Sequence, residues 1–221
     1  MPPSRVTEIR LEPSEPKTET GSVEVRVQFE NGGLSTFSAA TPDQPALWAE
    51  KGKKGFFFGS PVLFVSRLEG ACVEAAVAAM ASDMGGYWLR YYNSPKKKPA
   101  REAGLKFKVA SVVLTEAYPP RKPDHGCAAA QSIITDGREF SFLTSTPSWF
   151  KKTFFEMALP YYYGPSFLFV RKLDQALLRK AVKAMAEEGD RLLCLYDTPR
   201  RTLPEVLAEF KTKHSDPAQA G

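Results

Sequence analysis

Cysteine and histidine are scarce in this sequence, which has three cysteines and two histidines among 221 residues. Three cysteines without close spacing do not make a disulfide framework. A structural zinc site normally takes four Cys or His ligands at recognisable spacing, so we expect no metal. Glycine-rich phosphate loops and the Gly-x-Ser-x-Gly nucleophile motif are also missing. The sequence therefore predicts no cofactor.

Long apolar runs are missing as well. A membrane-spanning helix needs about 18 apolar residues, whereas the longest run here, residues 56–65, is interrupted by Gly59, Ser60 and Pro61. The first twenty residues are polar and acidic, and they lack the apolar stretch of a secretory signal. These absences favour a cytoplasmic protein that does not contact membranes. The 43% hydrophobic content excludes a disordered chain.

An internal repeat is the most informative feature that the sequence does contain. Shifting the chain by 105 residues against itself aligns similar residues without a gap from about residue 21 to 92. The aligned positions include glycines, Thr-Pro pairs and aromatic triplets followed by glycine: Gly32 with Gly137, 41–42 with 146–147, and 56–59 with 161–164. A duplicated module of about 105 residues would explain one register held over this length.

Each copy predicts the same succession of elements. Alternating apolar residues predict strands, and Asn31-Gly32 and Asp136-Gly137 predict hairpin turns between them. Thr-Pro at 41–42 and 146–147 predicts helix starts. The following aromatic runs are typical of central strands. These aromatic strands are predicted at residues 56–68 and 161–173. An amphipathic helix follows each of them, with inward positions Val73, Ala76, Val77 and Met80 in the first copy and Leu178, Ala181, Val182 and Met185 in the second. Each copy is predicted to end in a strand, at residues 87–92 and 191–196.

The predicted fold class is α/β (α+β), with two tandem related modules in a pseudo-twofold arrangement. Each module is roughly β-β-β-α-β-α-β, and the groove between the copies is the expected binding place. The predicted divisions are a first repeat, a basic linker, a second repeat, and a C-terminal helix with its tail: residues 1–95, 96–108, 109–200 and 201–221.

Positive charge is concentrated in the predicted linker. Six basic residues and one acidic residue give residues 96–108 an excess of five, equal to the net charge of the whole chain. Such a cluster either contacts the phosphates of a nucleic acid or is a solvated, self-repelling linker. The candidate binding residues are Lys96, Lys97, Lys98, Arg101, Lys106 and Lys108.

Two further groups of residues are candidates for chemistry or binding. His125 and Cys127 are the only His and Cys that lie close in the sequence, and they are weak candidates for a base and a nucleophile. The alternative is a turn that precedes a strand. Phe57 and Tyr162, the middle rings of the aromatic triplets, are candidates for ligand contact. Cys72 and Cys194 are expected to be buried small apolar residues.

The leading functional hypothesis is a non-enzymatic binding protein that acts through a protein–protein surface, as an adaptor, inhibitor or immunity-type protein. It is motivated by well-formed modules without a cofactor motif and by too few histidines for common acid–base chemistry. One alternative is a nucleic-acid-binding protein that uses the basic linker. The other is an enzyme with a single site at the junction of the repeats.

Overall fold

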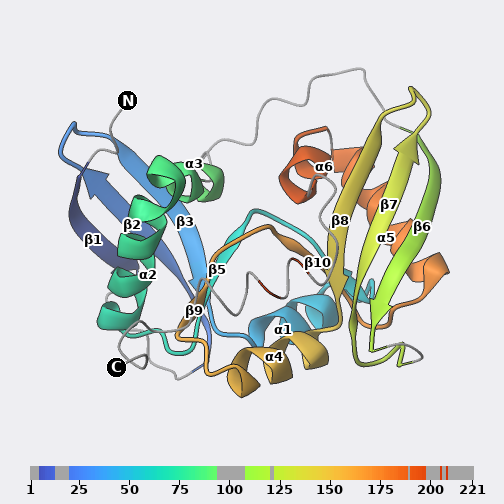
Figure 1. The fold of residues 1–221 in the computed structure, drawn as a ribbon, viewed down its shortest axis with the longest axis horizontal. Helices are drawn as coiled ribbons and strands as arrows, with labels where there is room; N and C mark the ends of the chain where they lie inside the picture. Colours follow the sequence, from blue (N-terminus) through green and yellow to red (C-terminus); the bar gives the residue numbers. More distant parts are fainter. Residues whose placement is uncertain are drawn as a thin grey trace.

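Two mixed sheets, with helices packed against them, make up the computed structural model, which describes residues 5–12, 20–93, 108–119, 122–188, 190–197, 205 and 208 (Figure 1). The first sheet has the order β1-β2-β3-β5-β9 and the second the order β4-β10-β8-β7-β6. The strands of the first are β1 (Val6–Glu12), β2 (Ser22–Phe29), β3 (Leu34–Ala40), β5 (Val62–Val65) and β9 (Tyr161–Tyr162). Those of the second are β4 (Phe56–Phe57), β10 (Phe167–Val170), β8 (Glu139–Ser145), β7 (Cys127–Ile134) and β6 (Val109–Tyr118).

The predicted hairpins are confirmed in both sheets. Strands β2 and β3 pair antiparallel, as do β7 and β8. Gly32 and Gly137 take left-handed backbone angles, with φ of +77° and +88°. The side chains of Asn31 and Asp136 instead accept hydrogen bonds from the backbone two residues later, at 2.9 and 3.1 Å. Each turn therefore uses its glycine for backbone freedom and its Asn or Asp as a local acceptor.

The aromatic runs do not form single central strands, and here the sequence-based prediction is wrong. Each run is broken into two short strands that belong to different sheets. Strand β5 lies parallel to β3 in the first sheet, while β4 pairs antiparallel with β10 in the second. Likewise, β9 crosses to the first sheet and pairs with β5. Glycine and proline separate the two short strands of each run, as Gly59-Ser60-Pro61 does between β4 and β5. These residues interrupt the hydrogen-bond ladder and allow the chain to pass from one sheet to the other.

The helices cover one face of each sheet and one end of the junction. Helix α2 (Gly70–Ser82) buries the four residues predicted to face inward, and α5 (Gln175–Glu188) does the same with its predicted set. Helix α4 (Pro147–Glu156) begins at the predicted Thr-Pro pair, with the Thr146 hydroxyl accepting from the Trp149 N–H. Helix α1 (Gln44–Lys51) begins later than predicted, after Asp43. Helices α1 and α4 lie side by side beneath the junction (Figure 1).

The last element of each half is a helix, so the predicted strands at 87–92 and 191–196 are also wrong. The helices are α3 (Tyr87–Tyr92), which follows the 3-10 turn η1 (Asp83–Gly86), and α6 (Asp190–Tyr196). The apolar run Tyr-Trp-Leu-Arg-Tyr-Tyr suits a buried strand or a buried helix, and periodicity alone does not separate them. In the structure, Trp88, Leu89 and Tyr92 are buried, at the spacing of one helical face.

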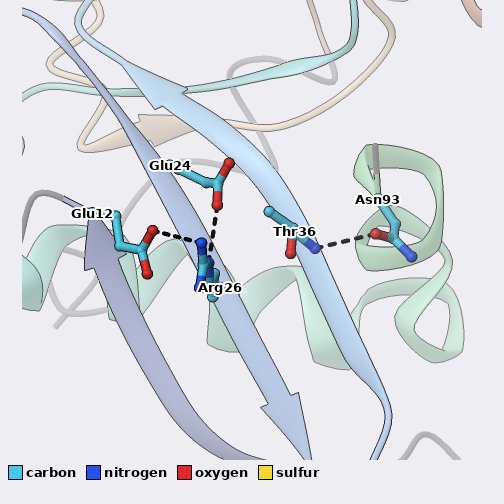
Figure 2. Close-up of polar contacts among 5 residues, drawn as sticks. All are labelled: Glu12, Glu24, Arg26, Thr36 and Asn93. Carbon is cyan, nitrogen blue, oxygen red and sulfur yellow. Dashed lines mark hydrogen bonds and ion pairs between the residues drawn. The ribbon is translucent and has the colours of Figure 1, made fainter. Parts of the chain in front are cut away.

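Polar contacts tie α3 to the first sheet and neutralise the sheet's outer face (Figure 2). The backbone N–H of Thr36 in β3 donates to the side-chain oxygen of Asn93 at 3.1 Å. Arg26 of β2 lies between two carboxylates, at 2.6 Å from Glu12 and 2.9 Å from Glu24. The guanidinium is therefore already paired within the sheet and does not present an open positive charge.

Three clusters of buried residues form the core. One lies between the first sheet and α2, and another lies between the second sheet and α5. The third cluster, between the sheets and the helices α1 and α4, is dominated by aromatic rings. Within it, the Phe64 ring of β5 lies 4.7 Å from the Phe150 ring of α4 and 5.9 Å from the Phe169 ring of β10. This cluster joins residues from both halves of the chain into one packed unit.

Two predictions lie largely outside the described residues. In the basic linker, Lys96, Lys97, Lys98, Arg101 and Lys106 fall there, whereas Lys108 is described and exposed. The backbone carbonyl of Lys108 accepts a hydrogen bond from the Thr135 N–H at 2.8 Å. The predicted C-terminal helix, within residues 201–221, is described only at Glu205 and Ala208, both assigned as helical.

Candidate functional site

A shallow hollow lies where the two sheets exchange strands. Its free volume is about 20 Å³, which is room for about one water molecule and far below the volume of a small-molecule site. Its walls are mainly aromatic and come from both sheets and from the helices α3 and α6. The lining residues are Phe57, Ser60, Val62, Phe64, Tyr92, Tyr162, Pro165, Ser166, Phe167, Phe169 and Tyr196.

Two buried tyrosines hold the hollow together through reciprocal contacts. The hydroxyl of Tyr92, at the end of α3, both accepts from the Gly164 N–H and donates to the Gly164 carbonyl, each at 3.1 Å. The hydroxyl of Tyr196, at the end of α6, makes the same pair of bonds with Gly59, at 2.9 and 3.3 Å. Each tyrosine thus satisfies the backbone of the crossing segment that comes from the other half of the chain.

These tyrosines are suited to structure rather than to proton transfer. Burial raises the pKa of Tyr92 and of Tyr196 well above the usual value near 10. Both hydroxyls therefore stay neutral at physiological pH. The Tyr162 hydroxyl is likewise engaged, because it donates to the Pro165 carbonyl at 3.0 Å. The hollow offers rings and satisfied hydroxyls, which is a surface for contact.

An exposed apolar turn continues the hollow outward along α3. The Tyr91 hydroxyl contacts the Ser166 hydroxyl at 3.2 Å and donates to the Leu195 carbonyl of α6. The Tyr87 ring stacks on the Tyr91 ring at 6.0 Å and is 42% exposed. Met84, one turn earlier, is 63% exposed. Aromatic and apolar side chains thus run from the hollow to the solvent.

The backbone of this 83–87 turn is unusual. Met84, Gly85 and Gly86 all take left-handed angles, with φ of +48°, +62° and +74°. A left-handed methionine is uncommon, since its Cβ crowds the backbone. The turn is held by the Trp88 indole N–H, which donates to the Asp83 carboxylate at 3.0 Å. Lys53 and Ala158 also take left-handed angles, with φ of +52° and +49°, but Met84 is the large apolar side chain among the three.

The aromatic residues predicted as contacts meet at the hollow. Phe57 of β4 and Tyr162 of β9 both line it. Phe57 is half-buried, and its ring lies 4.6 Å from the ring of Trp48 on α1. Tyr162 is only 4% exposed. A partner therefore reaches the Phe57 ring more directly than the Tyr162 ring.

His125 and Cys127 lie in different surroundings. The His125 ring nitrogen Nδ1 lies 3.3 Å from the Ser148 hydroxyl at the start of α4. Cys127 is fully buried within the aromatic cluster. The Ser148 hydroxyl donates to the Asp124 carbonyl at 3.2 Å, so its proton points away from the histidine. This arrangement gives His125 a structural neighbour and leaves the Cys127 thiol inaccessible.

The other two cysteines differ from expectation. Cys72 is half-buried, and its thiol donates to the Pro160 carbonyl at 3.2 Å. Cys194 is exposed, so the prediction that it is buried is wrong. The error follows from the element assignment, because position 194 lies on the helix α6 rather than in a covered strand.

Sequence reasoning missed the exposed 83–87 turn. The available signal was the Met-Gly-Gly sequence between two apolar stretches, because paired glycines favour left-handed turns. That pattern did not show that Met84 and Tyr87 stay exposed. Their exposure depends on Trp88, Leu89 and Tyr92 occupying the buried face of α3.

Neither a family model, nor a curated protein, nor a solved structure matches this chain. Within the described residues, no group of three or more His, Cys, Asp or Glu side chains is placed to hold a metal ion. None of the helices in the described part of the chain is both long and apolar enough to cross a membrane.

The packing of the crossing segments predicts unequal effects for two equivalent glycines. A Cβ on Gly164 would lie 2.7 Å from the Tyr162 hydroxyl and 2.9 Å from its ring carbon Cζ, whereas on Gly59 the nearest atom would be Phe57 Cζ at 3.4 Å. Because Tyr162 is buried and hydrogen-bonded, we expect Gly164→Ala to lower the free energy of unfolding by about 1–3 kcal/mol. Gly59→Ala should cost less than about 1 kcal/mol. Urea unfolding of both variants measures the difference, and equal losses would contradict this packing.

Proposed function

We propose that this protein is a non-enzymatic binding protein that acts through a protein–protein surface, as an adaptor, an inhibitor or an immunity-type protein. The observation that carries the proposal is the exposed, strained apolar turn at 83–87, continuous with the aromatic hollow. Exposed Tyr and Met side chains on a rigid support are typical of contact hot spots. The hollow is too small to enclose a metabolite, so a contact across the surface of its rings suits it better.

We also propose that the two halves arose by duplication and are related by a pseudo-twofold axis. Support comes from hydrogen bonds that recur 105 positions apart. The Gly21 N–H donates to the Thr41 hydroxyl at 3.0 Å, and the Gly126 N–H donates to the Thr146 hydroxyl at the same distance. The reciprocal tyrosine contacts are similar but are not matched at this offset, because Gly59 and Gly164 are 105 positions apart whereas Tyr92 and Tyr196 are 104 apart. The proposed groove between the copies includes the hollow, whose lining residues come from both halves of the chain.

The geometry favours binding over catalysis. Of the two side chains proposed for nucleophilic chemistry, His125 contacts the Ser148 hydroxyl and Cys127 is fully buried in the aromatic cluster. The tyrosines around the hollow are neutral, and their hydroxyls are occupied by backbone groups. A single active site at the junction would need a titratable group near neutrality, and the hollow's described lining is built from aromatic, aliphatic and serine side chains.

The proposal is tested by substituting the exposed turn. In Met84→Asn/Tyr87→Gln, both apolar tips become polar, and asparagine tolerates the left-handed backbone better than methionine. We expect the purified wild type to retain a stoichiometric protein from nuclease-treated extract of its own host. Against that partner, the variant should lose tenfold or more in affinity, measured by calorimetry.

The matched control is Leu34→Gln/Phe155→Gln, which removes two apolar side chains of similar exposure elsewhere, 54% and 49%. This variant should bind the partner as the wild type does. Absence of any nuclease-resistant partner would contradict the proposed function. Equal affinity of the turn variant and the wild type would remove the 83–87 turn from the contact surface.

A further inference from the structure

Strand exchange brings three loops together at the second sheet. The end of α1 and the loop that follows it, residues 51–55, reach the end of β10, where the N–H of the next residue, Arg171, donates to the Gly55 carbonyl at 2.7 Å. The segment after β10 in turn contacts the β6–β7 connection, because the Leu173 N–H donates to the Pro123 carbonyl at 2.7 Å. Residues that are far apart in the sequence thus form one continuous surface.

This surface is strongly basic. The described residues of the three segments include six basic ones, and three acidic residues lie in or beside these segments, Glu50, Asp124 and Asp174. The surface therefore has an excess of three positive charges. Among the described residues, the only ion pair of this group joins Lys172 and Asp124, at 3.9 Å, and Asp174 is engaged in capping α5. All six basic side chains are exposed. We name them the basic loop cluster: Lys51, Lys53, Lys54, Lys122, Arg171 and Lys172.

The corresponding loops of the first sheet show that the backbone contact between these loops does not require the positive charges. There the same backbone contact is made by the Ser66 N–H and the Pro160 carbonyl, at 2.8 Å. The residues preceding Pro160, 157–159, are uncharged, and Arg67 is paired with Glu69 at 3.6 Å. One junction is therefore neutral and the other carries the cations. The difference points to a ligand at the basic one.

The backbone of an exposed aromatic residue, Tyr118, lies close to the backbone of the basic loop cluster. The backbone carbonyls of Tyr118 and Lys122 both approach Gly126, since a Cβ there would lie 2.7 and 3.4 Å from them. Tyr118 is 54% exposed. Lysines that follow a phosphate backbone, together with a ring on which a base can stack, are the elements of single-strand recognition. Among the described residues of the three loops there is no large exposed aliphatic side chain, so these residues offer little that would insert into a bilayer.

We infer that the basic loop cluster binds the phosphate backbone of a single-stranded nucleic acid, with Tyr118 as a stacking platform. This inference goes beyond the proposed function and involves other residues than the 83–87 turn. It also differs from the hypothesis that the linker lysines Lys96, Lys97 and Lys98 make the contact.

Fluorescence anisotropy with a labelled single-stranded DNA of about 20 nucleotides tests it across a salt series. Lys51→Gln/Lys53→Gln/Lys54→Gln should weaken binding about tenfold or more at low salt and should reduce the slope of log K against log salt by about two. Tyr118→Ala should weaken it about fivefold or more. The control Arg179→Gln/Lys180→Gln/Lys183→Gln removes three charges from the exposed face of α5 and should change the affinity less than twofold.

Several results would overturn the inference. One is absence of binding by the wild type at low salt. Another is equal weakening by the α5 control, which would indicate general charge attraction. A third is loss of binding in Lys96→Gln/Lys97→Gln/Lys98→Gln with none in the loop variant. Co-sedimentation with phosphatidylserine vesicles without DNA binding would assign the cluster to membranes instead. The Met84→Asn/Tyr87→Gln variant should bind DNA normally, which separates this test from that of the proposed function.

Discussion

Expressed separately, the fragments 1–95 and 108–221 are expected to remain unfolded, and mixing them should restore the native fold. Each sheet takes its fifth strand from the other fragment, β9 for the first sheet and β4 for the second. The aromatic cluster also needs both fragments, because Phe64 packs on Phe150 and Phe169. A fragment alone would therefore expose a central strand edge and half of a core, and we expect neither to reach a cooperative native state.

Circular dichroism and size-exclusion chromatography with light scattering measure this outcome. The separate fragments should show no cooperative urea transition, whereas the mixture should give a 1:1 complex with one. The intact chain under the same conditions is the control. A fragment that folds alone as a monomer would contradict the energetic importance of strand exchange. A stable homodimer of one fragment would show that the crossing strand can be replaced by its own copy.

Local sequence signals predicted much of the frame because their causes are local. The Asn-Gly and Asp-Gly turns need only a glycine with a left-handed angle, and both are found where predicted. The inward faces of α2 and α5 follow from helical periodicity. Thr146 caps α4 as predicted, whereas α1 begins after Asp43, although Thr41 makes the same contact with Gly21 that Thr146 makes with Gly126.

The exchange of strands between the two sheets could not be predicted from local sequence patterns. Strands β4 and β9 have two residues each, and nothing in a pair of aromatic residues specifies which sheet they join. That choice depends on long-range pairing, such as Phe57 with Phe169. The same limit applies to α3 and α6, where the choice between helix and strand follows from packing against a sheet.

The candidate surfaces were only partly predictable for the same reason. Phe57 and Tyr162 were identified from the aromatic triplets, and they meet because the crossing segments meet. The basic loop cluster could not be recognised from Lys53 and Lys54 alone, since Arg171 joins them only through the contact with Gly55. Residues that meet only because the sheets exchange strands have no characteristic spacing in the sequence from which their contact could be predicted.

Replacing the two reciprocal tyrosines by phenylalanine should be the most damaging conservative change to the junction. Tyr92→Phe keeps the ring but leaves the N–H and carbonyl of Gly164 without their partner, and Tyr196→Phe does the same to Gly59. An unsatisfied buried polar group costs about 1–3 kcal/mol. We therefore expect each variant to lose about 2 kcal/mol of unfolding free energy and the double variant about 4 kcal/mol. Tyr118→Phe, at an exposed ring, is the control and should change it by less than about 0.5 kcal/mol.

Alkaline pH provides an independent test of the same contacts. Because burial raises the pKa of Tyr92 and Tyr196 in the folded chain, the unfolded state loses these protons first, above pH 10. Their contribution to stability is complete below pH 10 and declines as pH rises, by up to about 1.4 kcal/mol per pH unit for each tyrosine. Urea midpoints between pH 8 and 11 should fall more steeply for the wild type than for Tyr92→Phe/Tyr196→Phe, which retains a slope from Tyr91 and Tyr163. Parallel pH profiles would mean that the two hydroxyls are open to water and do not hold the crossing segments.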